Sequence, residues 1–319
     1  MAAGEMEYSV EREIDEFFKK TSTTRTVCDS YAKEHLGGDV IPVAVQGFRL
    51  KSLMLKMETV NLARTVYGHF APQVMFKGLI GKDIDGKEPL YIYIMARIGV
   101  ISYLDFLLTH NRHVPENSPT FSSWRKSLVT DIARFFAMSW KAPQNVDEIS
   151  RERLLHQYER ELQLLLHSLP DRFHPFIRKS LSSLQAILSL PMVLLHKDFG
   201  VCNIMVNEAS CNLRLICKVH LKNGWIRYND YILLENIFWS TFREEAGELS
   251  DETIRIIKSA RVVGLLLSCG FTPRLANMSE PIPIQDDESG KYNMRNLDGL
   301  LINPATRFTE LDDYVKLID

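Results

Sequence analysis

Short predicted strands interrupt the helical part of the chain and enclose a polar loop. Apolar residues recur at helical spacing over most of residues 102–188, and the same spacing returns over residues 231–267. Between these regions, the apolar runs at residues 192–195 and 204–206 predict two strands, and a polar loop at residues 196–203 joins them. We therefore expect a mainly helical domain in which a small β segment presents one polar loop.

The first part of the chain mixes helices with a β-hairpin. Amphipathic helices are predicted over residues 10–20, 28–36 and 50–70. Residues 74–80 and 90–96 predict strands, and the pair Asp85-Gly86 between them is a strong hairpin-turn signal. The chain up to residue 97 is therefore expected to form a small α+β part.

The rest of the chain is predicted to be mostly helical. Helices are predicted over residues 102–111, 124–138, 155–169, 176–188, 231–245 and 251–267. Ser102 is expected to cap the first of these helices, and residues 213–219 predict a third strand. The residues after the last helix predict a mostly polar tail that contains Pro281, Pro283 and Pro304. The expected fold class is therefore α+β, with a small front part followed by a helical bulk.

Composition and charge exclude several classes of protein. The chain has 319 residues, and at about 150 residues per domain this length predicts two domains or lobes. It carries 38 Lys and Arg against 40 Asp and Glu, which argues against a nucleic-acid binder or a polybasic membrane-surface protein. No apolar run approaches the roughly 20 residues that span a bilayer, and the acidic N-terminal residues match no targeting signal. We expect a soluble, cytoplasmic protein without nucleic-acid or membrane partners, and five reduced cysteines without disulfides.

The loop at residues 196–203 has a spacing that is typical of phosphoryl transfer. His196, Asp198 and Asn203 follow the pattern His-x-Asp-x-x-x-x-Asn. An aspartate at this place accepts or orients the hydroxyl proton of the acceptor, and the asparagine presents its carbonyl oxygen to a metal ion on the nucleotide phosphates. The histidine anchors the loop backbone. The three residues are therefore the candidate catalytic residues, and Asn203 is the candidate metal ligand.

Several longer motifs carry a resemblance to a known family. They are FRLKSLMLK (residues 48–56), LARTVYG (62–68), PLYIYIMARIGV (89–100), DIARFFAMSWKAP (131–143), LLHKDFGVCNIMV (194–206) and MRNLDGLLINPATRF (294–308). With these motifs, the chain resembles the aminoglycoside phosphotransferase and choline-kinase-like proteins, and within them a fungal-type subgroup. The resemblance covers about residues 27–311, which is most of the chain.

The resemblance implies a fold, a reaction and a set of site residues. The implied fold is bilobal and protein-kinase-like, with a nucleotide-side lobe over residues 1–97 and a helical lobe over residues 98–319. The implied reaction transfers a phosphoryl group from ATP, with Mg²⁺, to a small-molecule alcohol or amine. In this comparison Asp198 is the catalytic base, and Met95 and Arg97 lie near the hinge where adenine docks.

One departure from the family concerns the second metal ligand. In the family, the strand after the catalytic loop ends in an Asp that holds the divalent cation, and this position falls on Lys218 here. The neighbouring residues Cys217 and Val219 are not carboxylates either. A protonated ammonium repels a divalent ion and cannot ligate it. Lys218 is therefore expected to contact the nucleotide phosphates itself, without a metal between them.

A second departure is the length of the front lobe. A kinase-like lobe begins with three strands and a Gly-rich loop, which together need roughly 19 residues. The stretch from Asp39 to Arg49 offers 11 residues. Arg49 stands about where the family has a basic phosphate-binding residue, with Glu58 as its candidate partner, although a solvated helix face accounts for both equally well. We expect a shortened lobe without the Gly-rich hairpin.

Three functions stay open at this point. The first is a pseudokinase-like module of impaired activity that binds a small molecule or a protein partner, and the two departures favour it. The second is an active ATP-dependent O-kinase with Asp198 as the base. The third is chemistry without phosphate, in which Cys202 is a nucleophile near His196. Four acidic residues could either hold a cationic acceptor or lie on exposed helix faces, so the sequence does not identify the acceptor; they are Asp230, Glu235, Glu244 and Glu245.

Overall fold

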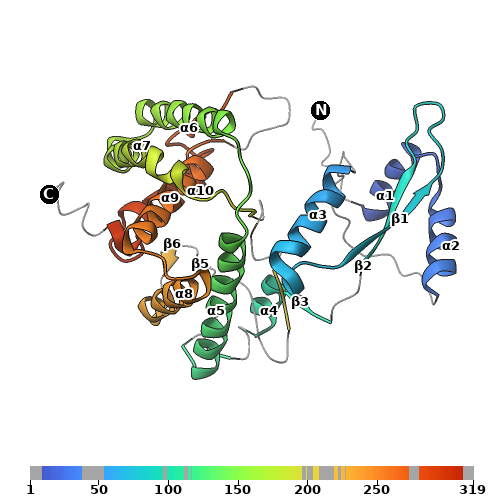
Figure 1. Ribbon diagram of the computed structural model, residues 1–319, viewed down its shortest axis with the longest axis horizontal. Helices are drawn as coiled ribbons and strands as arrows, with labels where there is room; N and C mark the ends of the chain where they lie inside the picture. The colour runs from blue at the N-terminus through green and yellow to red at the C-terminus, as the bar shows by residue number, and fades with distance from the viewer. Residues whose placement is uncertain are drawn as a thin grey trace, which may run out of the picture. The chain divides into compact units, whose positions relative to one another are not determined.

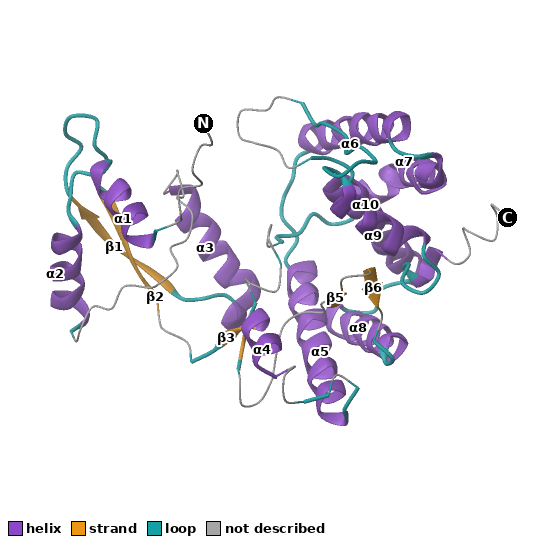
Figure 2. Ribbon diagram, turned by 180° about the vertical axis from the view of Figure 1, so that it is seen from behind, coloured by secondary structure: helices purple, strands orange, loops and turns teal. Residues whose placement is uncertain are grey.

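The computed structural model describes two compact units. The described residues are 9–37, 54–95, 99–110, 114–115, 117–195, 199, 204–207, 219–221, 224–226, 228–272 and 280–311. The chain divides into Met1–Ile98 and Gly99–Asp319, close to the division expected after residue 97. Helices account for most of the described residues, and the described strands form three two-stranded sheets (Figure 1, Figure 2). The predicted α+β class is confirmed.

The N-terminal unit begins with helices whose ends are set by local chemistry. They are α1 (Val10–Lys19), α2 (Arg25–Leu36), α3 (Met54–Tyr67) and the short turn η1 (Gly68–Phe70). Thr24 caps α2, because its Oγ1 accepts a hydrogen bond from the Val27 N–H at 3.4 Å. Gly37 ends α2 with φ of 68°, which glycine adopts without strain. The predicted start at residue 28 was too late, because the first turn is mostly polar and the prediction followed apolar residues.

The predicted hairpin is present in this unit. Strand β1 (Val74–Ile80) pairs antiparallel with β2 (Leu90–Met95). Asp85 and Gly86 have φ of 55° and 71°, and Ile84 forms a bridge to Lys87 across them. Two successive positive φ values give the type I′ turn, whose twist matches that of the flanking strands. The turn signal Asp85-Gly86 therefore located the hairpin correctly.

The C-terminal unit is built mainly from helices. They are α4 (Tyr103–His110), α5 (Pro119–Lys141), α6 (Glu148–Ser168), α7 (His174–Ser189), α8 (Tyr231–Ala246), α9 (Asp251–Cys269) and α10 (Lys291–Leu297), with the short turns η2 (Asp171–Phe173), η3 (Asp298–Ile302) and η4 (Thr309–Leu311). Side chains cap three of the long helices. Ser118, Asp147 and Ser250 each accept a hydrogen bond from the backbone N–H three residues further on, at the starts of α5, α6 and α9.

The strands of this unit are short and only partly as predicted. Strand β3 (Ile101–Ser102) pairs antiparallel with β4 (Met205–Val206), and β5 (Val219–Leu221) pairs with β6 (Gly224–Ile226). The strand predicted at residues 192–195 is wrong, since this described segment joins no sheet. A short apolar run can also be buried by packing alone. It forms a strand only where its backbone pairs with a neighbouring strand. Of the strand predicted at 213–219, the structure describes only Val219.

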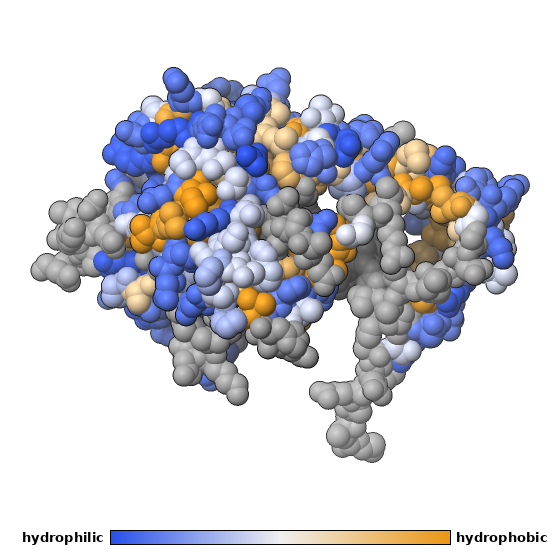
Figure 3. Space-filling view, turned by 90° about the horizontal axis from the view of Figure 1, so that it is seen from below, coloured by the Kyte–Doolittle hydropathy of each residue, from blue (hydrophilic) through white to orange (hydrophobic). Residues whose placement is uncertain are grey.

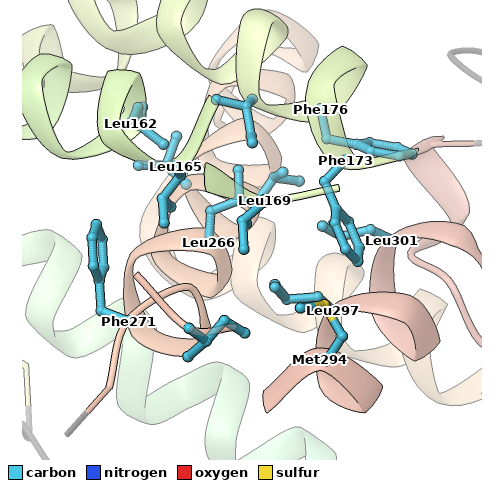
Figure 4. Close-up of a cluster of buried hydrophobic side chains, with 14 of the residues drawn as sticks. Leu162, Leu165, Leu169, Phe173, Phe176, Leu266, Phe271, Met294, Leu297 and Leu301 are labelled. Atoms are coloured by element: carbon cyan, nitrogen blue, oxygen red, sulfur yellow. The ribbon is translucent and has the colours of Figure 1, made fainter. Parts of the chain in front are cut away.

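The largest hydrophobic core of the C-terminal unit lies between α6, α7, α9 and α10 (Figure 4). Leu162 and Leu165 of α6, Leu266 of α9 and Leu297 of α10 are completely buried in it. Each such leucine stabilises the fold by about 2 kcal/mol through removal of apolar surface from water. Gly270 lets α9 end against α6, because a Cβ there would lie 2.5 Å from the Leu266 carbonyl oxygen and 2.7 Å from Leu165 Cδ1.

The predicted polar tail is wrong for residues 280–311. This segment contains α10 and contributes Ile284, Met294, Leu301 and Phe308 to the same core, each at most 8% exposed. Its apolar residues are spread over turns, α10 and the π-helical turn η3, so they follow no single period along the chain. The sequence pattern therefore concealed a part of the core.

The surface carries both apolar and polar side chains. Figure 3 shows hydrophobic residues between hydrophilic ones. Met75, Leu79 and Met95 of the hairpin are among the large apolar side chains that are exposed. Among the helices of the described part of the chain, none combines the length and the hydropathy that a membrane crossing needs.

Candidate functional site

The chain that leads into the loop at residues 196–203 is held by two neighbouring segments. The backbone N–H of Gln144, just after α5, donates a hydrogen bond to the Met192 carbonyl at 2.7 Å. Arg151 of α6 donates from one guanidinium nitrogen to the carbonyls of Leu188 and Leu190, at 2.6 and 3.1 Å. Both carbonyls belong to the end of α7, where helical partners are missing. The entry to the loop is therefore fixed to the region after α5 and to α6.

Phe199 anchors the middle of the loop to α5. Its ring stacks on Phe135 with the centroids 5.0 Å apart and 11° between the planes, and it meets Phe136 edge-on at 5.4 Å. Aromatic pairs in these geometries contribute about 0.5–1.5 kcal/mol beyond the burial of area. Asp198 directly precedes Phe199, and consecutive Cα atoms are about 3.8 Å apart. The stack therefore fixes Phe199, the residue that follows Asp198 in the sequence.

The chain that leaves the loop is held by burial and by backbone pairing. Ile204 and Val206 are 3% and 0% exposed, and they pack in a cluster with Tyr103, Phe106 and Ile132. The Tyr103 N–H donates to the Ile204 carbonyl at 2.8 Å, and β4 pairs with β3 directly after it. Ile204, the residue that follows Asn203 in the sequence, is therefore held in place.

The structure describes two of the eight predicted site residues. Glu58 is exposed on α3 and forms no ion pair with any residue that the structure describes. Met95 ends β2 and is 60% exposed. The other predicted residues and the alternative nucleophile lie outside the described residues; they are Arg49, Arg97, His196, Asp198, Cys202, Asn203 and Lys218. Their roles stay predictions, and the anchored ends of the loop are what the structure adds to them.

A mostly buried ion pair between α5 and the start of α8 could not be recognised from the sequence. Arg125 of α5 binds Asp230 at the start of α8, with Nε 3.1 Å from Oδ1 and a terminal nitrogen 3.0 Å from Oδ2. The side chains are 6% and 15% exposed. Ser122 donates a further hydrogen bond to Asp230 at 2.8 Å, and the Tyr228 ring lies 4.4 Å below the Arg125 guanidinium. The segment that follows β6 is thereby tied to the helix that anchors the loop.

The charge and hydrogen bonds of this pair explain why the pKa of Asp230 is lowered. Burial raises the pKa of Asp230, but the hydrogen bonds from Arg125 and Ser122 and the charge of Arg125 outweigh burial, so the pKa lies below its usual value. Since Arg125 already binds this carboxylate, Asp230 is not available to a cationic acceptor. The sequence shows Arg125 only as one polar residue on a long helix, and nothing in the pattern connects it to a carboxylate so far along the chain.

Glu235 also has an internal partner. It accepts a hydrogen bond from the Thr309 hydroxyl at 2.8 Å, and its other carboxylate oxygen lies 3.6 Å from the Arg261 guanidinium. Of the four acidic residues considered for the acceptor, Asp230 and Glu235 are thus engaged within the protein. No protein-family model, curated protein or solved structure matches this chain.

Proposed function

We propose that this protein is a degenerate relative of the aminoglycoside phosphotransferase and choline-kinase-like proteins, which binds a small molecule and has impaired phosphoryl transfer. In this proposal the fold is protein-kinase-like, with a shortened lobe over residues 1–97 and a helical lobe over residues 98–319. The proposal rests on the motif at residues 194–206 together with one structural observation. That observation is the anchoring of the loop at residues 196–203 before, within and after the candidate catalytic residues.

The anchoring supports a binding or catalytic loop over a simple connection. Connecting loops are usually exposed and tolerate variation, whereas loops that carry function are positioned by a rigid scaffold. Here Phe199 stacks on Phe135, and Ile204 is buried against the cluster around α4 and α5. A site that binds a ligand with a fixed geometry needs such support.

The side chains expected around the nucleotide phosphates suit a divalent cation only in part. Asn203 offers an amide oxygen and Asp198 a carboxylate, which are ordinary ligands of Mg²⁺. Lys218 offers an ammonium, which has three donors and no acceptor while it is protonated. In the family, an asparagine and an aspartate hold the cation together, and here the position of that aspartate falls on Lys218. The missing carboxylate accounts for the impaired activity in this proposal. In the proposed site Lys218 contacts an anionic group of the ligand directly.

An active phosphotransferase is the second candidate, and the same anchoring favours it. A general base must be held within hydrogen-bond reach of the proton that it accepts. In that case Asp198 accepts the proton of the acceptor's hydroxyl group. The hydroxyl oxygen attacks the γ-phosphorus of ATP, and ADP leaves. Lys218 must then supply the positive charge that a metal ion supplies in the family.

Calorimetric titration with ATP separates the two candidates. The native chain, Lys218→Asp and the matched control Lys222→Asp are each titrated with ATP, with and without Mg²⁺. For the native chain and the control, we expect an affinity that Mg²⁺ changes less than about twofold. For Lys218→Asp, we expect Mg²⁺ to raise the affinity at least about tenfold, which corresponds to 1.4 kcal/mol.

Two results contradict the proposal. The first is tight binding of ATP by the native chain only when Mg²⁺ is present. Such binding would mean that another carboxylate in the site holds the ion. The other is transfer of the γ-phosphate to water or to an added alcohol by the native chain at a rate of ordinary enzymes, about 1–100 per second. Either result favours the active phosphotransferase.

A further inference from the structure

A groove in the C-terminal unit lies away from the predicted loop in the sequence and has its own chemistry. It lies between α7 and α9, reaches η4, and has a volume of about 650 Å³, within the range of small-molecule sites. Its apolar lining comes from Phe176, Ile254, Val262 and Leu311, all at most 7% exposed as residues. These side chains belong to well-packed helices, so the groove exists before any ligand arrives.

Three cationic side chains line the same groove. Lys179 comes from α7, and Arg255 and Lys258 lie one turn apart on α9. Arg255 forms an ion pair with Glu252, and the Lys258 ammonium lies 5.0 Å from the centre of the Trp239 ring. Cationic residues therefore line the groove from both of the helices that form it.

The two carboxylates of the groove are already compensated. Asp251 lies 2.7 Å from a guanidinium nitrogen of Arg243, and Glu310 is bound by Arg261. Neither Arg243 nor Arg261 lines the groove. Each acidic group of the groove therefore has a cationic partner outside the groove, just as Arg255 has an acidic partner in Glu252.

Two hydroxyl groups of the groove already donate hydrogen bonds within the protein. Ser183 donates to the Lys179 carbonyl at 2.9 Å, and Ser259 donates to the Arg255 carbonyl at 3.1 Å. Both bonds stay within the residue's own helix. The three cationic side chains that line the groove carry donors that bind anionic oxygen atoms.

We infer that this groove binds a small organic anion with an apolar body. The anionic group, a carboxylate, sulfonate or phosphate, contacts Lys179, Arg255 and Lys258. The apolar body covers Phe176 and Ile254. The inference is independent of the function proposed for residues 196–203, because it uses none of those residues.

The test uses a fluorescent probe of the same chemistry. The full chain is titrated with 8-anilinonaphthalene-1-sulfonate, and with N-phenyl-1-naphthylamine, which has the same aromatic body without the sulfonate. We expect saturable binding of the anionic dye at one site and at least about tenfold weaker binding of the neutral dye. We also expect the anionic dye to bind at least about tenfold more weakly to the double variant Lys179→Ala, Lys258→Ala.

Arg178→Ala is the matched control, since Arg178 is exposed on α7 next to Lys179 and does not line the groove. We expect it to change the affinity for the anionic dye less than about twofold. All variants are compared by melting temperature, so that a folding defect is recognised. If the double variant fails to fold, Ser183→Trp, at a half-buried position of α7 that lines the groove, blocks the groove instead and is expected to give the same loss. Equal binding of both dyes, or equal affinity in the double variant and in Arg178→Ala, overturns the inference.

Discussion

The ring of Phe199 lies on the ring of Phe135, with the centroids 5.0 Å apart and 11° between the planes. This contact joins the middle of the loop at residues 196–203 to α5. Hydrogen bonds and burial hold the two ends of the loop, at Met192 and at Ile204. Phe199 and the residues on either side of the loop are therefore held in place, and this is the structural basis for the proposed function.

Phe199→Ala tests the importance of this stack. Replacing a fully buried phenylalanine by alanine costs about 3–5 kcal/mol, and for the half-buried Phe199 we expect about 2 kcal/mol. The melting temperature should fall by roughly 4–8 °C. Leu195→Ala is the control, because Leu195 is close in sequence but 54% exposed, and its effect should stay below about 0.5 kcal/mol. Equal melting temperatures for the two variants would show that Phe199 anchors nothing.

Asp230→Asn tests the ion pair between α5 and α8. The substitution leaves the buried Arg125 without a counter-charge, so we expect a loss of about 2 kcal/mol in the free energy of unfolding at neutral pH. Denaturant unfolding measures the loss. Glu248→Gln, an exposed carboxylate just after α8, serves as the control and should change stability by less than about 0.5 kcal/mol.

The same ion pair predicts how stability depends on pH. The pKa of Asp230 lies below its usual value, since its hydrogen bonds with Arg125 and Ser122 outweigh the effect of burial. A carboxyl with a lower pKa in the folded chain stabilises it fully above the unfolded pKa of about 3.9, and that stabilisation disappears as the pH falls toward the folded value. The difference in stability between the native chain and Asp230→Asn should therefore be constant near neutral pH and shrink below about pH 4. A difference that grows on acidification contradicts this account.

Two glycines of the same helix region should respond in opposite directions to alanine. A Cβ at Gly270 would lie 2.5 Å from the Leu266 carbonyl oxygen, so Gly270→Ala should destabilise the protein by about 1–3 kcal/mol. Gly264 lies in α9 with open space where a Cβ would be, so Gly264→Ala should stabilise it by about 0.5–1 kcal/mol. Thermal unfolding of both variants checks the prediction. Stabilisation by Gly270→Ala would mean that α6 and the end of α9 are farther apart than described.

Elements with strong local signals could be predicted from the sequence. The apolar stripe of α6 and the glycine after α2 located two helices, and Asp85-Gly86 located the hairpin. In each case the signal lies within the element, where periodicity or a positive φ is required by local geometry. The predicted ends were less accurate, because capping residues such as Thr24 precede the apolar pattern.

Features that depend on distant residues could not be predicted in the same way. The run at residues 192–195 resembled a strand because pairing partners are not visible in a short apolar segment. The core residues Ile284 and Phe308 are in irregular segments, where no period marks the buried side. The pairs Arg125 with Asp230 and Phe199 with Phe135 join residues far apart in the chain, and each partner alone has an ordinary place in its own segment.

For the candidate site, the sequence supplied residue types and the structure supplied the support of their loop. Asp198 and Asn203 were chosen from their spacing, and the residues beside them, Phe199 and Ile204, are the ones that the structure anchors. Lys218 comes from the resemblance alone and stays a prediction.

The measurement that tests the central claim most directly is the melting temperature of the native chain with ATP alone and with ATP plus Mg²⁺. A ligand that binds the folded chain raises its melting temperature. We predict the same temperature in both solutions, after correction for the effect of Mg²⁺ without nucleotide, because in the proposed site Lys218 stands where the family has the carboxylate that holds the ion. A further rise of several degrees with Mg²⁺ and ATP together would contradict the account.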